Sequence, residues 1–363
     1  MQKYNFLFLL ILIFITSCDP FDNIIEKKSN QDAAIYYVAN NIKTPENIGD
    51  TIKIATWNIK FGGGRIDFFF DCYGDRVLMK KSEVINNLTA LVKKINQMNP
   101  DVLYMQEVDI DSKRSAYVDQ LQWLLDNTNL NYGYYGSQWK SDYVPSDGIG
   151  KMNSGSAILC KFPLTNGERI PLPLIDEQSG IVQYFYLRRN ILKAKTTING
   201  KDLYLITTHT SAYSTDGTRL KQLKQIKDET EKLNSEGKTF ILGGDFNTIP
   251  PNSHIYENFD DSACANDPDF AAQSFKDQLD YMKIFSDCYE QAISQDRYDY
   301  DNSKFYSFTS DKNGFWNRKL DYIFTNGDFV DSTGMVHQDV STGGMETMPL
   351  SDHAPLSVEF ILK

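Results

Sequence analysis

The sequence has 363 residues, enough for a sizeable hydrophobic core, and its 41% hydrophobic and 23% charged residues exclude an intrinsically disordered chain. Its formal net charge of −11 excludes a basic surface that would hold nucleic acid passively. An enzyme that meets phosphate through bound cations is compatible with this charge, because a metal ion supplies the missing positive charge.

Residues 1–17 are predicted to be a lipoprotein signal peptide. Lys3 precedes the apolar run FLFLLILIFI at residues 6–15, which is too short to span a membrane as a helix. The following ITSC at residues 15–18 resembles a bacterial lipobox. We therefore expect a lipidated Cys18, a polar tether over residues 18–50, and an exported, membrane-anchored bacterial lipoprotein at the periplasm or cell surface. The alternative is an ordinary signal peptide with an incidental cysteine.

Residues 51–363 are expected to form one domain, because no linker rich in Pro, Gly or Ser divides them. Apolar periodicity predicts helices at residues 80–98, around 118–125, from 220 to a stop at Gly237, and around 275–293. Strands are predicted at residues 51–57, 101–107, 132–139, 155–161, 185–195, 202–208, 239–242, 305–309, 319–324, 329–336 and 354–362. Asn199-Gly200 marks a hairpin turn. Strands joined both by helices and by hairpins favour two face-to-face sheets with helices outside.

Four cysteines remain after Cys18, and none forms a CxxC pair typical of a zinc or redox site. Export permits disulfides, but the spacing does not choose among the three complete pairings of Cys72, Cys160, Cys264 and Cys288. Cys160 lies in an apolar strand and is expected to be a buried thiol. A Cys264–Cys288 bridge is one of the open alternatives.

Acid, amide and histidine side chains recur at the ends of the predicted strands, where loops gather and sites form. They are Asn58, Glu107, His209, Asp245, Asn247, Asp321, Asp352 and His353. Each alone has an ordinary explanation, such as a turn, a cap or a packed histidine. Their shared chemistry, with two of only four histidines among them, favours one common site.

The motifs NIKF, QEVD, TTHTSAY, GGDFNT, KLDYIF and SDHAPL, in this order, resemble the endonuclease/exonuclease/phosphatase superfamily, which includes deoxyribonuclease I. The resemblance extends over about residues 52–362. It implies an α/β four-layer sandwich of two packed mixed β-sheets flanked by helices. It also implies a metal-dependent phosphoester hydrolase, and Mg²⁺, or alternatively Mn²⁺, as the cofactor.

The resemblance makes Glu107 the principal metal ligand, with Asn58 nearby and Asp352 as a second contributor. Carboxylate oxygens suit Mg²⁺, which keeps several waters for substrate oxygens.

The catalytic residues implied are His209, Asp245, Asn247, Asp321 and His353. Residues i and i+2 of an extended segment face the same way, so Asp245 would orient water while Asn247 donates to a phosphoryl oxygen. Asp321 would hold His353. Asp245 or His353 is assigned to the water, and His209 to charge stabilisation or the leaving group.

For substrate binding, Arg189 matches a position that contacts phosphate in the family, with Arg188 as the register alternative. Asn153 is a further candidate. Ser156 departs from the family pattern, in which many members carry Asn at this position.

The favoured function is a nuclease-like phosphodiesterase, and the substrate is left open among nucleic acid, a nucleotide, a phospholipid and an inositol phosphate. The alternatives are a sphingomyelinase-like or inositol-phosphate or phospholipid hydrolase at the membrane, and a non-catalytic binding protein with the same fold. The aromatic stretches 68–70 and 132–135 are expected to touch lipid, stack on a base or pack in the core. No protein partner is implied, and a monomer is expected.

Overall fold

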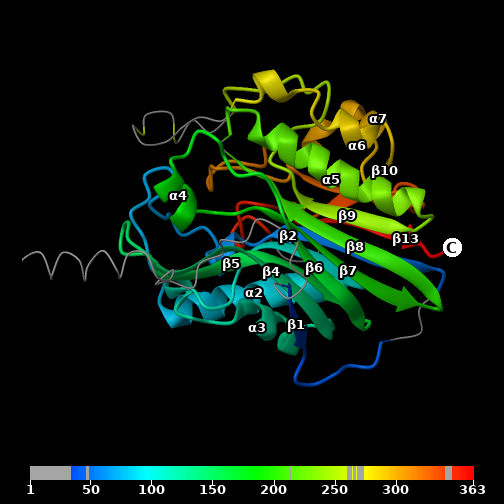
Figure 1. Cartoon of the computed structure of the whole chain (residues 1–363), viewed down its shortest axis with the longest axis horizontal. Helices are drawn as coiled ribbons and strands as arrows, with labels where there is room; N and C mark the ends of the chain where they lie inside the picture. Colours follow the sequence, from blue (N-terminus) through cyan, green and yellow to red (C-terminus); the bar gives the residue numbers. More distant parts are fainter. Residues whose placement is uncertain are drawn as a thin grey trace, which may run out of the picture.

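The computed structural model describes residues 34–45, 49–212, 214–259, 264, 267, 274–339 and 346–363, arranged as a four-layer sandwich (Figure 1). Two mixed β-sheets face each other, and helices cover their outer faces. The predicted fold class is confirmed. The predicted signal peptide and Cys18 lie outside the described residues. No helix in the described ranges is long and apolar enough to cross a bilayer.

The first sheet has seven strands, and its outer face is covered by α2 (Lys81–Met98) and α3 (Gln120–Asn127). Its strand order is β1 (Ala34–Val38), β4 (Tyr132–Val144), β5 (Gly150–Cys160), β3 (Val102–Asp109), β2 (Thr51–Asn58), β13 (Leu356–Ile361) and β12 (Met335–Val336). Only the β2–β3 pair is parallel among these neighbours. Two 3₁₀ turns, η2 (Lys60–Gly62) and η3 (Lys113–Ser115), follow the ends of β2 and β3.

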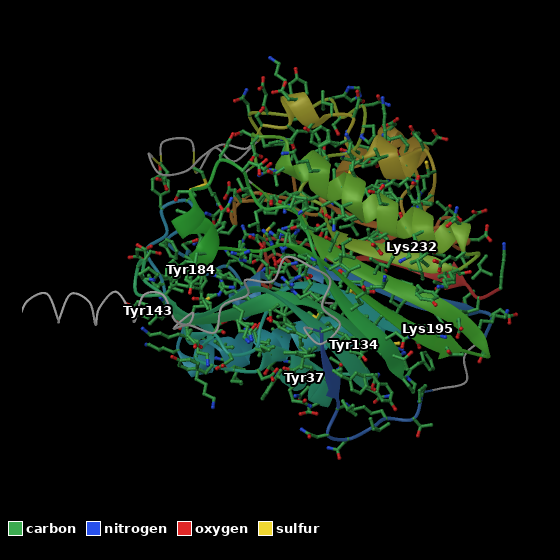
Figure 2. The ribbon with its side chains drawn as sticks, in the orientation of Figure 1. Tyr37, Tyr134, Tyr143, Tyr184, Lys195 and Lys232 are labelled. Carbon is green, nitrogen blue, oxygen red and sulfur yellow. A yellow bond between two sulfur atoms is a disulfide. The ribbon has the colours of Figure 1, made fainter. Side chains whose placement is uncertain are left out.

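The second sheet has six strands, and α5 (Thr218–Ser235) and α6 (Lys283–Ser286) cover its outer face. Its strand order is β10 (Glu290–Gln291), β11 (Asp321–Thr325), β9 (Phe240–Asp245), β8 (Lys201–His209), β7 (Asn190–Ile198) and β6 (Leu164–Pro171). The remaining elements are α4 (Gly180–Phe185), α7 (Gln295–Tyr300), η5 (Lys276–Gln278) and η6 (Asn302–Phe305). Side chains at the end of the molecule opposite α4 include Lys195 and Lys232 (Figure 2).

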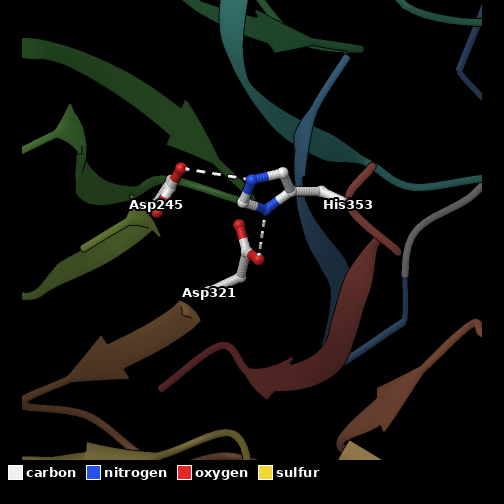
Figure 3. Close-up of side chains that lie close together, drawn as sticks. All are labelled: Asp245, Asp321 and His353. Atoms are coloured by element: carbon white, nitrogen blue, oxygen red, sulfur yellow. Dashed lines mark hydrogen bonds and ion pairs between the residues drawn. The ribbon is translucent and has the colours of Figure 1, made fainter. Parts of the chain in front are cut away.

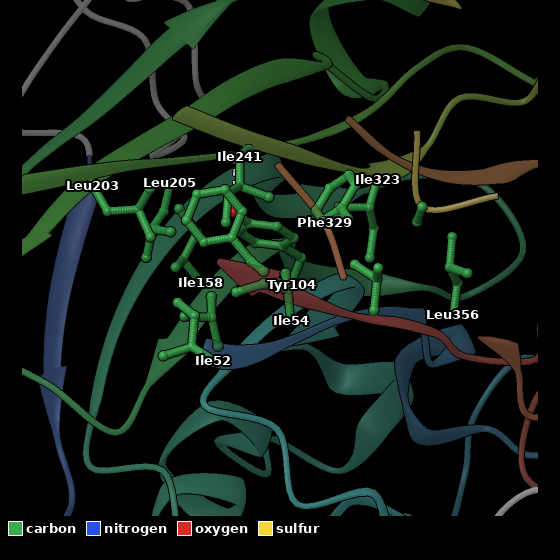
Figure 4. Packing of buried hydrophobic residues seen from close by; sticks show 14 of the residues in the cluster. Ile52, Ile54, Tyr104, Ile158, Leu203, Leu205, Ile241, Ile323, Phe329 and Leu356 are labelled. Carbon is green, nitrogen blue, oxygen red and sulfur yellow. Dashed lines mark hydrogen bonds between the residues drawn. The ribbon is translucent and has the colours of Figure 1, made fainter. Parts of the chain in front are cut away.

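The core between the sheets is built from the inward residues of both, because side chains alternate along each strand. Ile54 and Tyr104 of the first sheet pack against Leu205 and Ile241 of the second (Figure 4). The Tyr104 hydroxyl, whose pKa is raised by burial, donates to the carbonyl of Ile241 at 2.8 Å. This bond holds β9 in position against β3 across the core, and both strands carry site residues.

Most predicted elements are confirmed, including the hairpin at Asn199-Gly200. Both residues have positive φ angles, of 51° and 78°, and Ile198 pairs with Lys201 across the turn. The strand predicted from residue 185 is wrong in its first part, because Phe185 ends α4 and β7 begins at Asn190.

Further differences concern irregular segments. The strand predicted at residues 329–336 is reduced to β12 and a single bridge from Phe329 to Phe360. Residues 305–309 are not a strand: η6 ends at Phe305, and Phe308 makes only single bridges, to Arg318 and His353. The helix predicted around residues 275–293 is reduced to the 3₁₀ turn η5 and the short α6. Apolar spacing alone does not distinguish such turns from longer elements.

The segment expected to be a tether contributes a strand to the domain. β1 pairs antiparallel with β4, from Ala34 opposite Gly136 to Val38 opposite Tyr132. Only a short apolar stretch marks this strand in the sequence, AIYYV, and it lies at the edge of the sheet.

The disulfide joins Cys72 to Cys264, whose Cα atoms lie 5.4 Å apart. The alternative Cys264–Cys288 pairing is therefore wrong, and Cys288 is an exposed thiol. Cys160 is a buried free thiol, as expected, and burial raises its pKa to about 12. The 192 residues between the bridged cysteines show why spacing did not identify the pair.

Candidate active site

Three site residues lie side by side across adjacent strands of the second sheet. β8 and β9 run parallel and place His209 opposite Asp245, and β11 runs antiparallel and places Asp321 opposite the same Asp245. Asp245 is buried and central in this row. The register of three strands therefore delivers two carboxylates and one imidazole to one edge of the sandwich.

The two glycines before Asp245 are required by close approach. A Cβ at Gly243 would lie 2.6 Å from the ring of Tyr104, and a Cβ at Gly244 would lie 2.1 Å from the carbonyl oxygen of Thr208. Both distances are below any ordinary contact. The glycines thus allow β9 to pack tightly between the other sheet and β8 just before it presents Asp245.

His353 joins this row from the segment before β13 (Figure 3). Its Nδ1 lies 2.8 Å from Oδ2 of Asp321, and its Nε2 lies 3.5 Å from Oδ2 of Asp245. The Ser307 hydroxyl donates to the same Asp321 oxygen at 2.7 Å. Burial alone would lower the pKa of His353, but the Asp321 and Asp245 carboxylates outweigh it and raise that pKa to about 10. The two carboxylates therefore favour the charged imidazolium form of His353.

His209 has the opposite character. Its Nε2 lies 3.3 Å from Oδ2 of Asp245, whereas its Nδ1 is buried without a hydrogen bond in the described part of the chain. Burial, together with the charges of Arg189 and His353, holds the pKa of His209 well below its usual range. The two histidines on Asp245 are thus one neutral and one charged.

Glu107 reaches the site through an irregularity in β3. The pairing with β5 shifts register between Met105 and Val108, and Glu107 has a φ of 56°. Such a bulge redirects a side chain, at a backbone cost of about 1–3 kcal/mol. Burial and the neighbouring Asp352 carboxylate raise the pKa of Glu107.

Asn58, at the end of β2, holds the two carboxylates in place. Its Nδ2 donates to Oε1 of Glu107 and to Oδ2 of Asp245, each at 3.1 Å, and its Oδ1 accepts the backbone N–H of Lys60 at 3.0 Å. Carboxylates accept and an N–H donates, so this network fixes the orientation of the amide. The oxygen of Asn58 is turned toward the backbone, so the structure places Asn58 as a positioning group behind Glu107.

Asp352 is a second carboxylate close to Glu107 in the cavity lining. Burial alone would raise the pKa of Asp352, but the positive charges of Lys60, His353 and Arg65 lower it. The Lys60 ammonium is 2.7 Å from Asp71 and 4.0 Å from Asp352. Glu107, whose pKa is raised, and Asp352, whose pKa is lowered, are therefore neighbouring carboxylates.

Asn247 lines the cavity, but not through an extended backbone as expected. Its φ is 46°, and its backbone N–H returns to Oδ1 of Asp245 at 2.9 Å in an Asx-turn. Its Nδ2 donates to the carbonyl of Thr210 at 3.0 Å. The turn brings Asp245 and Asn247 to the same side.

The structure distinguishes between the two arginines. Arg189 lines the cavity and donates from Nη1 to Gln138 at 3.0 Å, whereas Arg188 is absent from the lining and donates to the carbonyl of Gln183. Gln138 in turn donates to Ser156 at 3.0 Å. Ser156, the departure from the family pattern, is thus fully buried and supports Arg189 through Gln138.

Asn153 is not brought to the site. Its side-chain Oδ1 accepts hydrogen bonds from the hydroxyls of Ser137 at 2.7 Å and Tyr135 at 3.3 Å, and the neighbouring Ser154 lines the cavity instead. The Asn153 side chain is thus buried and absent from the cavity lining where the substrate contact was expected.

These residues open into a cavity of about 610 Å³. Both disulfide cysteines line it. Its walls also contain Arg65, Asp67, Phe69, Phe70, Asp71, Tyr73, Gln138, Trp139, Ile175, Gln178, Tyr186, Leu187, Arg189 and residues 310–313. Phe69 and Phe70 are exposed in it, whereas Phe68 is fully buried in the core. In the second aromatic stretch, Tyr135 is also buried.

Sequence reasoning missed Gln138, Ser307 and Arg114. Arg114 donates two hydrogen bonds, each 2.9 Å, to the Asp109 carboxylate. Its positive charge opposes the rise in the Glu107 pKa. None of the three lies in a recognisable motif. Only the tertiary contacts identify them.

Comparison with solved structures gives the same fold. The most similar include an endonuclease/exonuclease/phosphatase from Beutenbergia cavernae, with 18% identity, a TM-score of 0.59, and coverage of 86% of this chain and 72% of that one. Truncated TDP2 of Caenorhabditis elegans has 16% identity, a TM-score of 0.51 and coverage of 86% and 97%. The human Nocturnin catalytic domain with bound sulfate has 15% identity, a TM-score of 0.52 and coverage of 91% and 98%.

A comparison with curated proteins finds no match. The sequence does match the model of the endonuclease/exonuclease/phosphatase family over residues 55–353, which contain every site residue described above. This supports a phosphoester hydrolase. The chain belongs to the endonuclease/exonuclease/phosphatase family.

Proposed function

We propose that the protein is a divalent-metal-dependent phosphoester hydrolase, and a phosphodiesterase in preference to a monoesterase. One observation carries the proposal. Oδ2 of Asp245 lies within 3.5 Å of His209, His353 and Asn58, in a cavity that also contains Arg189. This carboxylate oxygen is surrounded by hydrogen-bond donors and lies in the same cavity as the buried guanidinium of Arg189. Such an arrangement is suited to orienting a water for attack on phosphorus.

Glu107 and Asp352 would hold the cation, Mg²⁺ or Mn²⁺. Both line the cavity and offer the oxygen ligands that hard cations prefer, and Oε2 of Glu107 makes no hydrogen bond to the described residues. When bound, the cation neutralises charge on phosphoryl oxygens. Asn58 would orient Glu107 toward it through its 3.1 Å hydrogen bond.

A second group of possible ligands is less suitable for a cation. Ligand atoms of Asp245, Asp321 and His353 lie within 4.8 Å of one another. However, Asp321 is already hydrogen-bonded to His353 at 2.8 Å and to Ser307 at 2.7 Å. A cation there would replace these bonds, so we assign this group to proton chemistry.

In the proposed reaction Asp245 orients the water and accepts its proton. Burial and the nearby Asp321 raise the pKa of Asp245, against the opposing charge of His353, which brings the carboxylate closer to the pKa useful in a base near neutral pH. His353, held charged by Asp321, stabilises the developing negative charge. His209 is neutral, so it has a single ring N–H; on Nε2 this hydrogen faces Asp245, and it would turn to the phosphoryl or leaving oxygen when substrate is bound.

Arg189 would contact the phosphoryl oxygens. It is buried and bound to the neutral Gln138, with no carboxylate partner among the described residues. A charge without a counter-ion in such a position favours an anionic ligand. Asn247 retains one amide N–H beyond its bond to Thr210 for the same group.

The preference for a diester over a monoester rests on the size of the cavity. A cavity of about 610 Å³ is far larger than a phosphoryl group needs, and it extends to walls formed by separate loops. Room for substituents on the phosphorus favours a diester. A non-catalytic binding protein is disfavoured, because it would have no use for a base, a charged histidine and a neutral histidine on one oxygen.

The testing experiment is a substrate panel with the purified chain in Mg²⁺ or Mn²⁺. The panel includes plasmid DNA, RNA, sphingomyelin, phosphatidylinositol, inositol phosphates and bis(4-nitrophenyl) phosphate. We expect turnover of a diester that EDTA abolishes. Unchanged activity in EDTA would contradict the metal, and hydrolysis of monoesters alone would contradict the diesterase.

The membrane anchor is proposed from the sequence alone. The apolar run at residues 6–15 followed by ITSC supports lipidation of Cys18. Expression in a bacterium fed labelled palmitate should label the chain, and Cys18→Ser should lose the label. Labelling that survives Cys18→Ser would contradict this anchor.

A further inference from the structure

The cavity has a second region, apolar and aromatic, that the phosphoryl chemistry does not use. Phe70 is 46% exposed and Tyr186 is 37% exposed, and both line the cavity together with Trp139. Large exposed aromatic side chains in a concave site are typical of ligand contacts. We call Phe70, Trp139 and Tyr186 the aromatic subsite.

The aromatic subsite has two walls, one formed by Phe70 and the other by Tyr186 and Trp139, and different neighbours support each wall. Phe70 stacks on the buried Phe68, with ring centroids 5.7 Å apart, and contacts Phe61 edge-on at 5.9 Å. Tyr186 contacts Trp139 at 6.0 Å, and the Trp139 indole N–H donates to the carbonyl of Phe185 at 2.7 Å. Phe70 therefore rests on a buried ring and Tyr186 on a half-buried ring that is held by its own hydrogen bond, so little conformational entropy is lost on binding.

Arg114 connects the two walls. Its guanidinium carbon lies 3.7 Å from the Phe61 ring centroid and 5.9 Å from that of Trp139. Asp109 holds it through two hydrogen bonds of 2.9 Å, so its position is fixed. Because Arg114 and Trp139 line the same cavity as Glu107 and Arg189, the aromatic subsite is contiguous with the proposed metal and phosphoryl site.

β4 links the phosphoryl site to the aromatic subsite a second time. The pairing of β4 with β5 shifts register between Ser137 and Trp139, so the neighbours Gln138 and Trp139 both reach the cavity. Gln138 holds Arg189, and Trp139 contacts Tyr186. A group covalently attached to the phosphorus is thus directed toward the aromatic rings.

The chemistry of the walls selects the kind of group. An acyl chain would desolvate the charged side chains of Arg65 and Asp311, which also line the cavity, without forming hydrogen bonds to them. A planar heterocycle has apolar faces for Phe70 and Tyr186 and polar edges for the charged groups. We propose that the aromatic subsite binds a nucleobase-like planar ring attached to the phosphoester; this deepens, and rests on, the proposed hydrolase function.

The test compares the methyl diester of adenosine 5′-phosphate with the same ribose diester lacking the base. Phe70→Ala and Tyr186→Ala should each raise KM for the base-bearing diester about tenfold, the effect of losing one stacked ring, and change kcat by less than about twofold. KM for the base-free diester should not change. Tyr186→Phe keeps the ring and should keep the wild-type KM.

Tyr300→Ala is the matched control, because Tyr300 is 91% exposed and lies outside the cavity lining. An equal rise in KM on both diesters, or no rise on either, would overturn the aromatic subsite. A rise in KM for the base-free diester alone would also overturn the aromatic subsite. Melting temperatures of all variants within about 2 °C of wild type exclude misfolding as the cause.

Failure of the hydrolase function gives a different result. If the wild type cleaves neither diester, the substrate panel still decides the hydrolase function, and calorimetric titration with adenosine 5′-phosphate and ribose 5-phosphate tests the subsite separately. Tighter binding of adenosine 5′-phosphate that is lost in Phe70→Ala supports the aromatic subsite. Equal affinities for the two ligands overturn it.

Discussion

The Asp321 carboxylate and the His353 imidazole form a buried pair, with Nδ1 of His353 2.8 Å from Oδ2 of Asp321. The pair orients the ring, because the proton on Nδ1 is committed to Asp321 and Nε2 is left facing Asp245. Since Ser307 donates to the same oxygen, that oxygen must act as an acceptor only. The arrangement requires an acceptor oxygen at this position of the Asp321 side chain.

Replacing Asp321 by Asn removes the carboxylate charge. The amide oxygen can still accept from His353 and Ser307, but it is neutral, so the imidazolium loses the negative charge bound to its Nδ1. We expect kcat to fall by about 10²-fold or more with little change in KM. Steady-state kinetics on the best diester of the panel measures this. Ser307→Ala removes the hydroxyl that donates to Asp321 and accepts the backbone N–H groups of Leu320 and Asp321, but it keeps the Asp321 carboxylate on His353. It should therefore reduce kcat much less; an Asp321→Asn enzyme of wild-type kcat would refute the role.

The two adjacent arginines make a matched pair. Arg189→Ala removes the buried guanidinium that faces the cavity and should lower kcat/KM by about 10²-fold. Arg188→Ala removes a hydrogen bond to the carbonyl of Gln183 outside the cavity and should leave kcat/KM within about threefold. Equal losses in the two variants would contradict the assignment of Arg189 to the phosphoryl group.

The cysteines are expected to differ in reactivity. In the folded, non-reduced protein iodoacetamide should modify the exposed Cys288 and leave the buried Cys160, whose pKa is about 12, unmodified. Peptide mapping should find Cys72 linked to Cys264. Modification of Cys160 without denaturant, or a linked Cys264–Cys288 peptide, would show that the structure is incorrect there.

Asp216 should make folding stability depend on pH. It accepts the backbone N–H of Thr218 at 2.9 Å, the Ser214 hydroxyl at 3.0 Å and the backbone N–H of Asp176 at 2.7 Å. Burial alone would raise the pKa of Asp216, but these bonds outweigh it and lower that pKa in the folded state. A lowered folded pKa means that the stabilisation is complete above the unfolded pKa of about 4 and is lost as pH falls below it.

Urea unfolding of the wild type and Asp216→Asn measures this effect. The variant should be less stable by about 1–2 kcal/mol near neutral pH, and the difference should shrink below about pH 4. A difference that stays constant with pH would mean that the charge of Asp216 plays no part.

The strand ends were predictable because they depend on local signals. Alternation and apolar runs place β2, β3, β8 and β9, and the polar residues that follow them are visible as motifs. Parallel pairing of β8 with β9 then brings His209 and Asp245 together without further information. The glycines before Asp245 were also correctly interpreted as allowing close approach, here to Tyr104 and Thr208.

The rest depends on contacts between distant segments. Cys72 and Cys264 are 192 residues apart, and nothing local marks them as partners. Asn58 and Asn153 have the same side-chain chemistry, but the first faces two carboxylates and the second faces Ser137 inside the sheet. The bulges at Glu107 and Gln138 shift the alternation of two strands, and the sequence periodicity does not reveal them.

The most direct test of the hydrolase mechanism is the turnover of bis(4-nitrophenyl) phosphate in Mg²⁺ by the wild type and by Asp245→Asn. The account predicts measurable release of nitrophenol by the wild type and a loss of about 10²-fold or more in the variant, at an unchanged melting temperature. Equal turnover by the two proteins would contradict the account, because no other described carboxylate lies within hydrogen-bonding range of both His209 and Asn58.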